Sequence, residues 1–165
     1  MRYSMAKRSQ MTKRYIKIIP LTLLVMLCTA FIFSNSLKNI EESRADSDVI
    51  VEVVEEICDK IAPDNDLNFD YIVRKGAHLT EFFLLGALTT MHYIQVGKRR
   101  KCSVAFVFLY VIAVAFTDEF IQRFTGRGSS ITDVVIDVCG AFIGISAVLL
   151  VALMVKKHLN KKRSC

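Results

Sequence analysis

Residues 131–155, ITDVVIDVCGAFIGISAVLLVALMV, form the longest apolar block of the chain and decide its fold class. A helix needs about 20 residues to cross the hydrocarbon core of a bilayer, so this block is long enough to span a membrane. Backbone polar groups find no water inside a bilayer, and a continuous block of this kind satisfies them by forming a helix. The sequence therefore predicts a membrane protein.

Three further apolar blocks occupy residues 18–33, 77–96 and 102–116. Over its 165 residues the chain is 53% hydrophobic with a mean hydropathy of +0.39, more apolar than an ordinary soluble domain. The pattern predicts an all-α, multi-pass membrane protein. We expect one domain over residues 1–165, folded as a four-transmembrane-helix bundle with an acidic outer segment at 34–75.

The basic residues predict the orientation of this bundle. Six Lys or Arg lie in residues 2–17, four in 98–101 and five in 156–163, and these segments contain no Asp or Glu. Four spans place all three segments on one side, which the positive-inside rule makes cytoplasmic. The leader also fits a signal peptide, but no A-x-A site follows, so we expect an uncleaved signal anchor. The basic residues that flank the membrane spans account for the net charge of +6, and we therefore expect no nucleic-acid partner.

The outer segment carries eleven acidic residues. Within it Ile50, Val53, Ile57 and Ile61 recur at helical spacing. We expect a short amphipathic helix here, with Asp46 or Ser47 capping its start and Pro63 following its end. A solvated run of charges is the alternative interpretation.

The five cysteines predict neither a zinc site nor a disulfide. They are Cys28, Cys58, Cys102, Cys139 and Cys165, and none forms a CxxC or Cys/His spacing. We interpret them as small apolar residues.

Ionisable residues in membrane helices are costly and are candidates for function. The expected topology brings those of three spans to the outer end of the bundle. The predicted ligand-binding residues are Arg74, Lys75, His78 and Glu81, then Asp118, Glu119 and Gln122, then Arg127 in the following turn, and Asp133 and Asp137. His92 lies near the other end, and we interpret it as an interfacial residue with a structural partner.

Helical spacing indicates how these side chains are directed. His78 and Glu81 share one face of their helix. Asp133 and Asp137 share a face with Gly140 and Gly144, and small residues allow a neighbouring helix to approach closely. We therefore expect both aspartates to point into the bundle.

Several chemistries fit this set of residues. Imidazole and carboxylates could bind a divalent cation of unspecified identity, or share a proton as an acid/base pair. In an enzyme, His78, Glu81 and Asp118 would be the catalytic residues. Arg74 and Arg127, together with Lys75, could hold a phosphate. Alternatively, the charges only pair with one another and set the register of the helices.

Assembled in order, these residues resemble the VanZ-like family of bacterial membrane proteins. The resemblance rests on Arg74-Lys75-x-x-His78-x-x-Glu81-Phe82-x-x-Leu85-Gly86, Asp118-Glu119-x-x-Gln122, Gly126-Arg127 and Asp133-x-x-x-Asp137-x-x-Gly140-x-x-x-Gly144, together with Ser34-Asn35-Ser36. The chain departs from many members at Ile121, where they carry His, and at Thr125, where they carry Pro. The family is named for a member that gives low-level resistance to teicoplanin.

The resemblance implies a bacterial cell membrane and an envelope context. We expect the partners to be membrane lipids or a lipid-linked envelope ligand, bound at the outer polar site, with an effect on glycopeptide or lipopeptide susceptibility. The alternatives are an enzyme acting on a lipid headgroup, and a small transporter or accessory subunit. The sequence leaves the cofactor and the oligomeric state open.

Overall fold

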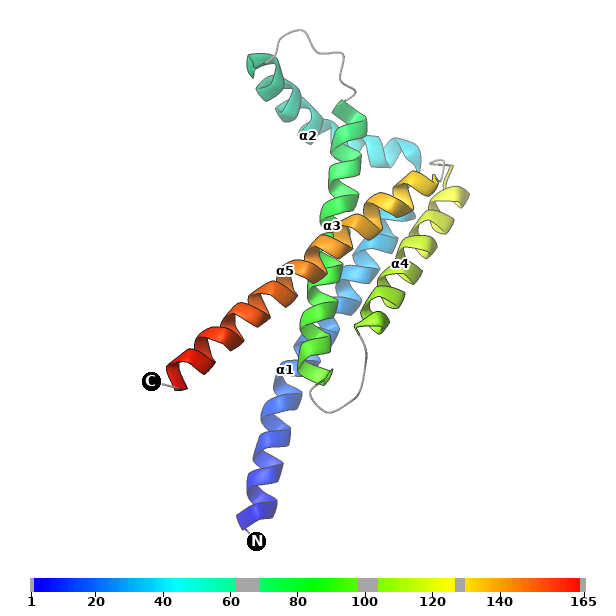
Figure 1. The fold of residues 1–165 in the computed structure, drawn as a ribbon. Helices are drawn as coiled ribbons and strands as arrows, with labels where there is room; N and C mark the ends of the chain where they lie inside the picture. Colours follow the sequence, from blue (N-terminus) through cyan, green and yellow to red (C-terminus); the bar gives the residue numbers. More distant parts are fainter. Residues whose placement is uncertain (1, 62–68, 98–103, 127–129, 164–165) are drawn as a thin grey trace.

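The computed structural model describes residues 2–61, 69–97, 104–126 and 130–163, and these contain helices and no strand. The helices are α1 (Arg2–Ser36), α2 (Ile40–Ile61), α3 (Phe69–Gly97), α4 (Ala105–Phe124) and α5 (Ile131–Arg163). Figure 1 shows α1, α3 and α4 side by side, with α5 crossing α3 at an angle and α2 at one end. The all-α prediction is confirmed.

Three of the described helices are long and apolar enough to cross a membrane. They are Ile18–Ser36 in α1, Ala105–Phe124 in α4 and Ile131–Lys162 in α5. The block expected as a further span, 77–96, lies in α3 and is not among these three, because ionisable residues such as Glu81 and His92 interrupt its apolar character. The chain is therefore a helical protein with membrane-spanning character, as predicted.

Several helices extend beyond the apolar blocks. The apolar block at 102–116 belongs to a helix that begins at Ala105 and ends at Phe124, so Asp118 and Gln122 lie one turn apart within that same helix. Residues 102 and 103 lie outside the described part of the chain. The helix continues because these two polar side chains are buried against other helices, on the same side as Val111 and Val114. The charged residues Asp118 and Glu119 therefore do not end α4.

The acidic outer helix begins earlier than predicted. It starts at Ile40, with Asn39 as its N-cap, and not at Asp46 or Ser47. The Asn39 side chain accepts a hydrogen bond from the backbone N–H of Glu42 at 2.9 Å, and the Glu42 carboxylate accepts one from the N–H of Asn39 at 3.2 Å. This reciprocal pair is a capping box, which satisfies two backbone donors at the start of a helix.

Helices α3 and α5 make the most extensive contact in the bundle. A Cβ atom added at Gly140 would collide with the carbonyl oxygen of Leu79, and one at Gly144 with that of Phe83. From the other side, a Cβ at Gly86 would collide with the backbone of Ala141. The prediction of a small-residue face that admits a neighbouring helix closely is confirmed.

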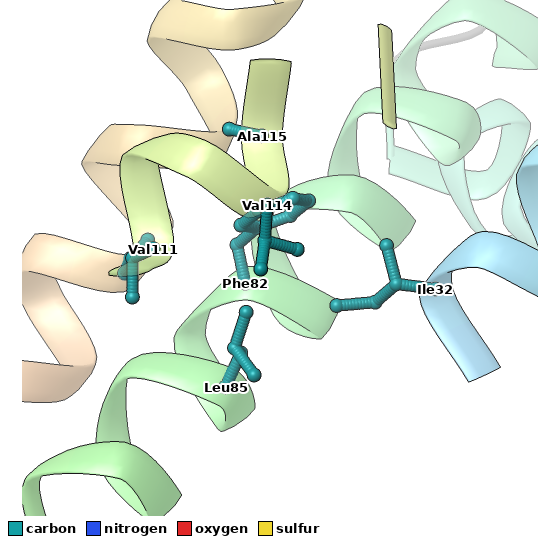
Figure 2. Packing of buried hydrophobic residues seen from close by; sticks show 7 residues of the cluster. Ile32, Phe82, Leu85, Val111, Val114 and Ala115 are labelled. Carbon is teal, nitrogen blue, oxygen red and sulfur yellow. The ribbon is translucent and has the colours of Figure 1, made fainter. Parts of the chain in front are cut away.

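The apolar core lies where α1, α3, α4 and α5 meet. Figure 2 shows Ile32 of α1 and Phe82 and Leu85 of α3 facing Val111 and Val114 of α4. Many large apolar side chains elsewhere are exposed, while eight polar or charged residues are buried. The described residues thus place polar groups inside and apolar groups outside, which suits a lipid environment.

The ends of α1, α3, α4 and α5 form two groups, one at each end of the molecule. In Figure 1 the N-terminal end of α1, the C-terminal ends of α3 and α5, and the start of α4 lie toward one end. The C-terminal ends of α1 and α4 and the starts of α3 and α5 lie toward the other end, where α2 is found. This second end is called the α2 end below.

Candidate functional site

Polar side chains from four helices meet toward the α2 end of the bundle. The helical repeat of α4 places Asp118 and Gln122 one turn apart on its buried face. The close contact of α5 with α3 directs Asp137 toward His78, and Ser36 reaches the group from the last residue of α1. We call Ser36, His78, Asp118, Gln122 and Asp137 the polar junction.

The centre of the polar junction is a histidine with two carboxylates. His78 Nδ1 lies 3.5 Å from Oδ1 of Asp137 and 3.8 Å from Oδ2 of Asp118. Both aspartates are completely buried, and the His78 side chain is 13% exposed. Each of the three residues comes from a different helix, so the packing of α3, α4 and α5 alone creates this group.

Asp118 is held firmly in place. Ser36 donates a hydrogen bond to its Oδ1, and Gln122 Nε2 donates one to its Oδ2 at 2.8 Å. Thr125 connects the same two neighbours, since its hydroxyl lies 3.1 Å from the carbonyl oxygens of both Ser36 and Gln122. The carboxylate therefore has a fixed orientation toward His78.

Asp137 is buried without comparable support. Neither of its carboxylate oxygens has a hydrogen-bond partner in the described structure, and His78 Nδ1 has none either. Burying an ionised carboxylate without hydrogen bonds is costly, and such groups in native structures call for an explanation. The polar junction is thus incompletely satisfied at its centre.

The neighbouring acids have partners of their own. Lys75 Nζ donates to Asp133 Oδ1, with the Tyr71 ring 5.1 Å from the same nitrogen. Glu119 accepts a hydrogen bond from the backbone N–H of Ser130 at 2.9 Å, although its other oxygen is unpartnered. Lys75, Asp133 and Glu119 therefore lie next to the polar junction in contacts that also fasten the start of α5.

A cavity of about 320 Å³ opens beside the polar junction, between α1, α2 and α3. Its polar lining consists of Asn35, Ser36, Lys38, Ser43, Arg74, His78 and Glu81, and its apolar lining of Phe31, Ile50, Val73 and Ala77. Asn35 Nδ2 donates to Glu81 Oε1 at 2.8 Å and fixes that carboxylate in the wall. Ser36 and His78 belong to both the cavity and the polar junction, so the two are continuous.

The predicted site residues fall into three groups. His78, Asp118, Gln122 and Asp137 converge in the polar junction, Arg74 and Glu81 line the cavity, and Lys75, Glu119 and Asp133 form the flanking contacts. Arg127 lies outside the described residues. The structure therefore brings together side chains of α3, α4 and α5, the three helices whose ionisable residues were predicted to lie at one end of the bundle.

Asn35 and Ser36 were not among the predicted site residues. Both come from the Ser34-Asn35-Ser36 tripeptide at the end of the first apolar block, and each hydrogen-bonds a predicted acid. The sequence could have indicated both residues, because a polar tripeptide at the expected outer end of the first span lies at the same depth as the other predicted site residues.

Fold and site together define a helical, membrane-type protein with a buried polar junction beside a cavity. A model of the VanZ/LLP1 family matches residues 19–154, and the chain belongs to this family. The matched region includes every residue of the polar junction. No curated protein and no solved structure matches the chain significantly.

Proposed function

We propose that this protein resides in the bacterial cell membrane and binds the headgroup of an envelope lipid or lipid-linked ligand in the cavity beside the polar junction. Through that binding it alters susceptibility to glycopeptide or lipopeptide antibiotics. The observation that carries the proposal is the composition of the cavity, in which a cationic and hydrogen-bonding wall adjoins an apolar one.

The proposed topology has four spans, with α3 as the additional one and both termini in the cytoplasm. Apolar spans α1, α4 and α5 surround α3, so its polar residues can face protein instead of lipid. The sorting of helix ends in Figure 1 and the basic segments at 2–17, 98–101 and 156–163 support the same orientation. The α2 end then faces outward.

Arg74 is the residue best suited to hold a phosphate. Its side chain is half-buried in the cavity wall, and no hydrogen bond or ion pair within the described residues engages it. A guanidinium can bind a phosphate through two parallel hydrogen bonds. Phe31 and Ile50 in the same cavity offer apolar contacts to the acyl chain of a bound lipid.

A purely structural role for the charges fits the site less well. Charges that only pair with one another would leave no buried acceptor without a hydrogen bond. Both oxygens of Asp137 and one of Glu119 make no hydrogen bond in the described structure, and the only ion-pair contact of Asp137 there, to His78, is 3.5 Å long. A set of structural ion pairs also requires no cavity. Both features support a site that interacts with something other than the chain itself.

The proposal is tested by lipid binding to the purified protein in detergent, with fluorescent short-chain phosphatidylglycerol as the probe. Arg74→Ala should weaken binding about tenfold, which corresponds to one lost charge-assisted hydrogen bond. Arg123→Ala is the matched control, because Arg123 is exposed on α4 and does not line the cavity. Equal weakening in both variants, or none in Arg74→Ala, contradicts the proposal.

An enzyme acting on a lipid headgroup is the second candidate. The specific observation in its favour is that His78 lines the cavity and also lies 3.5 Å from Asp137. His78 would transfer the proton, with Glu81 and Asp118 as the nearby carboxylates. Release of phosphate from a lipid phosphate by the purified protein, lost in His78→Asn, supports this function. Release that persists in His78→Asn contradicts it.

The polar groups deeper in the bundle favour binding at one end over transport through its depth. Thr89 and Thr90 are buried, but their hydroxyls donate to the carbonyl oxygens of their own helix at 2.6 and 2.7 Å. His92 lies 3.0 Å from the hydroxyl of Thr22, so it has a hydrogen-bond partner, as expected for an interfacial residue. Each of these residues therefore has a local partner, and they do not continue the polar junction as a relay.

A further inference from the structure

The three central residues of the polar junction have the spacing of metal ligands. One atom each from His78, Asp118 and Asp137 can be chosen so that all three lie within 4.8 Å of one another. In a tetrahedral zinc site, nitrogen and oxygen ligands about 2 Å from the ion are separated from each other by about 3.3 Å. The observed separations of 3.5 and 3.8 Å from His78 Nδ1 differ from this by a few tenths of an ångström.

Two of the same three residues contain buried atoms that lack hydrogen bonds in the described structure. Asp137 is completely buried, and its two oxygens and His78 Nδ1 have no hydrogen bonds in the described structure. The nearby cation Lys75 is engaged by Asp133, so it is not dedicated to Asp137. An imidazole that ligates a metal through Nδ1 is neutral, so the two aspartates then bring a charge of minus two to the site, and a divalent cation compensates this charge.

The surroundings of Asp118 resemble the outer shell of a metal site. Ligating carboxylates are themselves commonly held by hydrogen bonds, which fix their orientation toward the ion. Ser36 and Gln122 hold Asp118 in this way from two different helices. Each carboxylate oxygen has more than one lone pair, so Oδ2 can accept from Gln122 and also bind an ion.

We infer that His78 Nδ1 and one carboxylate oxygen each of Asp118 and Asp137 bind a divalent transition-metal ion of the zinc class. Three ligands, one of them imidazole, suit a four-coordinate ion, whereas calcium and magnesium take six or more oxygen ligands. The fourth position is taken by water. The metal site lies between α3, α4 and α5, whereas the cavity lies between α1, α2 and α3. The ion can therefore bind while the cavity holds no lipid.

The test measures metal binding by the full-length protein, stripped with a chelator and kept in lipid-free detergent. Zn²⁺, Mn²⁺ and Mg²⁺ are titrated separately by calorimetry, and bound metal is counted by elemental analysis after gel filtration. The wild type should bind one Zn²⁺ per chain, more tightly than Mg²⁺, and Zn²⁺ should raise its thermal stability.

Asp137→Asn and His78→Asn should each weaken Zn²⁺ binding at least a hundredfold. Asp137→Asn replaces a buried carboxylate that makes no hydrogen bond in the described structure with a neutral side chain of the same shape, so the variant should fold. His92→Asn is the matched control for His78→Asn, since it removes the other histidine of α3, whose partner is Thr22, and it should bind Zn²⁺ like the wild type.

Adventitious binding to the cysteines is the same in every variant and therefore cancels in the comparison. The inference is overturned if the wild type binds no more Zn²⁺ than Asp137→Asn, if His92→Asn loses as much binding as His78→Asn, or if Mg²⁺ binds more tightly than Zn²⁺. None of these results depends on whether the protein binds lipid, because no lipid is present.

Discussion

Ser36, the last residue of α1, donates a hydrogen bond to Asp118 in α4, 82 residues further along the chain. The serine is 1% exposed and the aspartate is completely buried, so water cannot replace this hydrogen bond. It joins the first apolar span to the polar junction and makes α1 part of the site.

Replacing Ser36 with alanine should therefore lower the free energy of unfolding by about 1.5–3 kcal/mol, the range for a hydrogen bond to a charged group. Ser34→Ala is the matched control, because Ser34 is exposed two residues earlier in the same helix and should change stability little. Reversible unfolding in mixed micelles measures both. A Ser36→Ala variant as stable as Ser34→Ala would show that the hydrogen bond contributes nothing.

The contact between α3 and α5 predicts opposite effects at two glycines. In Gly144→Ala the new methyl group meets the carbonyl oxygen of Phe83, so the helices must separate, at a cost of about 1–3 kcal/mol. In Gly76→Ala the new methyl group meets nothing within 4 Å, and the change should stabilise α3 by up to about 1 kcal/mol. Thermal unfolding in detergent compares the two. Equal stability would contradict the close approach of α3 and α5 at Gly144.

The sequence predicted three apolar spans that the described structure contains, and it placed ionisable groups of three helices at one end of the bundle. It did so because hydropathy blocks, basic flanks and helical spacing are local properties that need no knowledge of packing. The glycine face of α5 was also readable, since Gly140 and Gly144 recur at four-residue spacing beside Asp137.

The sequence did not reveal the features that depend on contacts between distant segments. The partners of Asp118 and Glu81 come from α1, and only the packed bundle shows that Ser36 and Asn35 reach them. The structure also shows that the helix of the third apolar block extends to Phe124, beyond the end of the block at residue 116. A charged residue such as Asp118 ends an apolar block, but it does not end a helix when tertiary packing buries it with partners.

The proposed four-span topology predicts the accessibility of the cysteines in intact cells. A membrane-impermeant maleimide should label Cys58, which follows the first span, and should spare Cys102 and Cys165 until the cells are opened. Variants that retain one cysteine each make the assignment unambiguous. Labelling of Cys165 from outside would contradict the topology, because it requires an odd number of spans.

The central claim is that the polar junction and its cavity act on a ligand, and susceptibility to teicoplanin in cells tests it most directly. His78→Asn keeps a polar group near the position of Nδ1, so the protein should fold. His92→Asn is the matched control, at the other histidine of the same helix, where Thr22 is the partner. Cells producing the wild type or His92→Asn should share an altered minimum inhibitory concentration. Cells producing His78→Asn should match those without the protein while accumulating it in the membrane within about twofold of the wild-type level. If His78→Asn fails to accumulate, or accumulates normally and still alters the inhibitory concentration as the wild type does, the polar junction is structural and the claim is wrong.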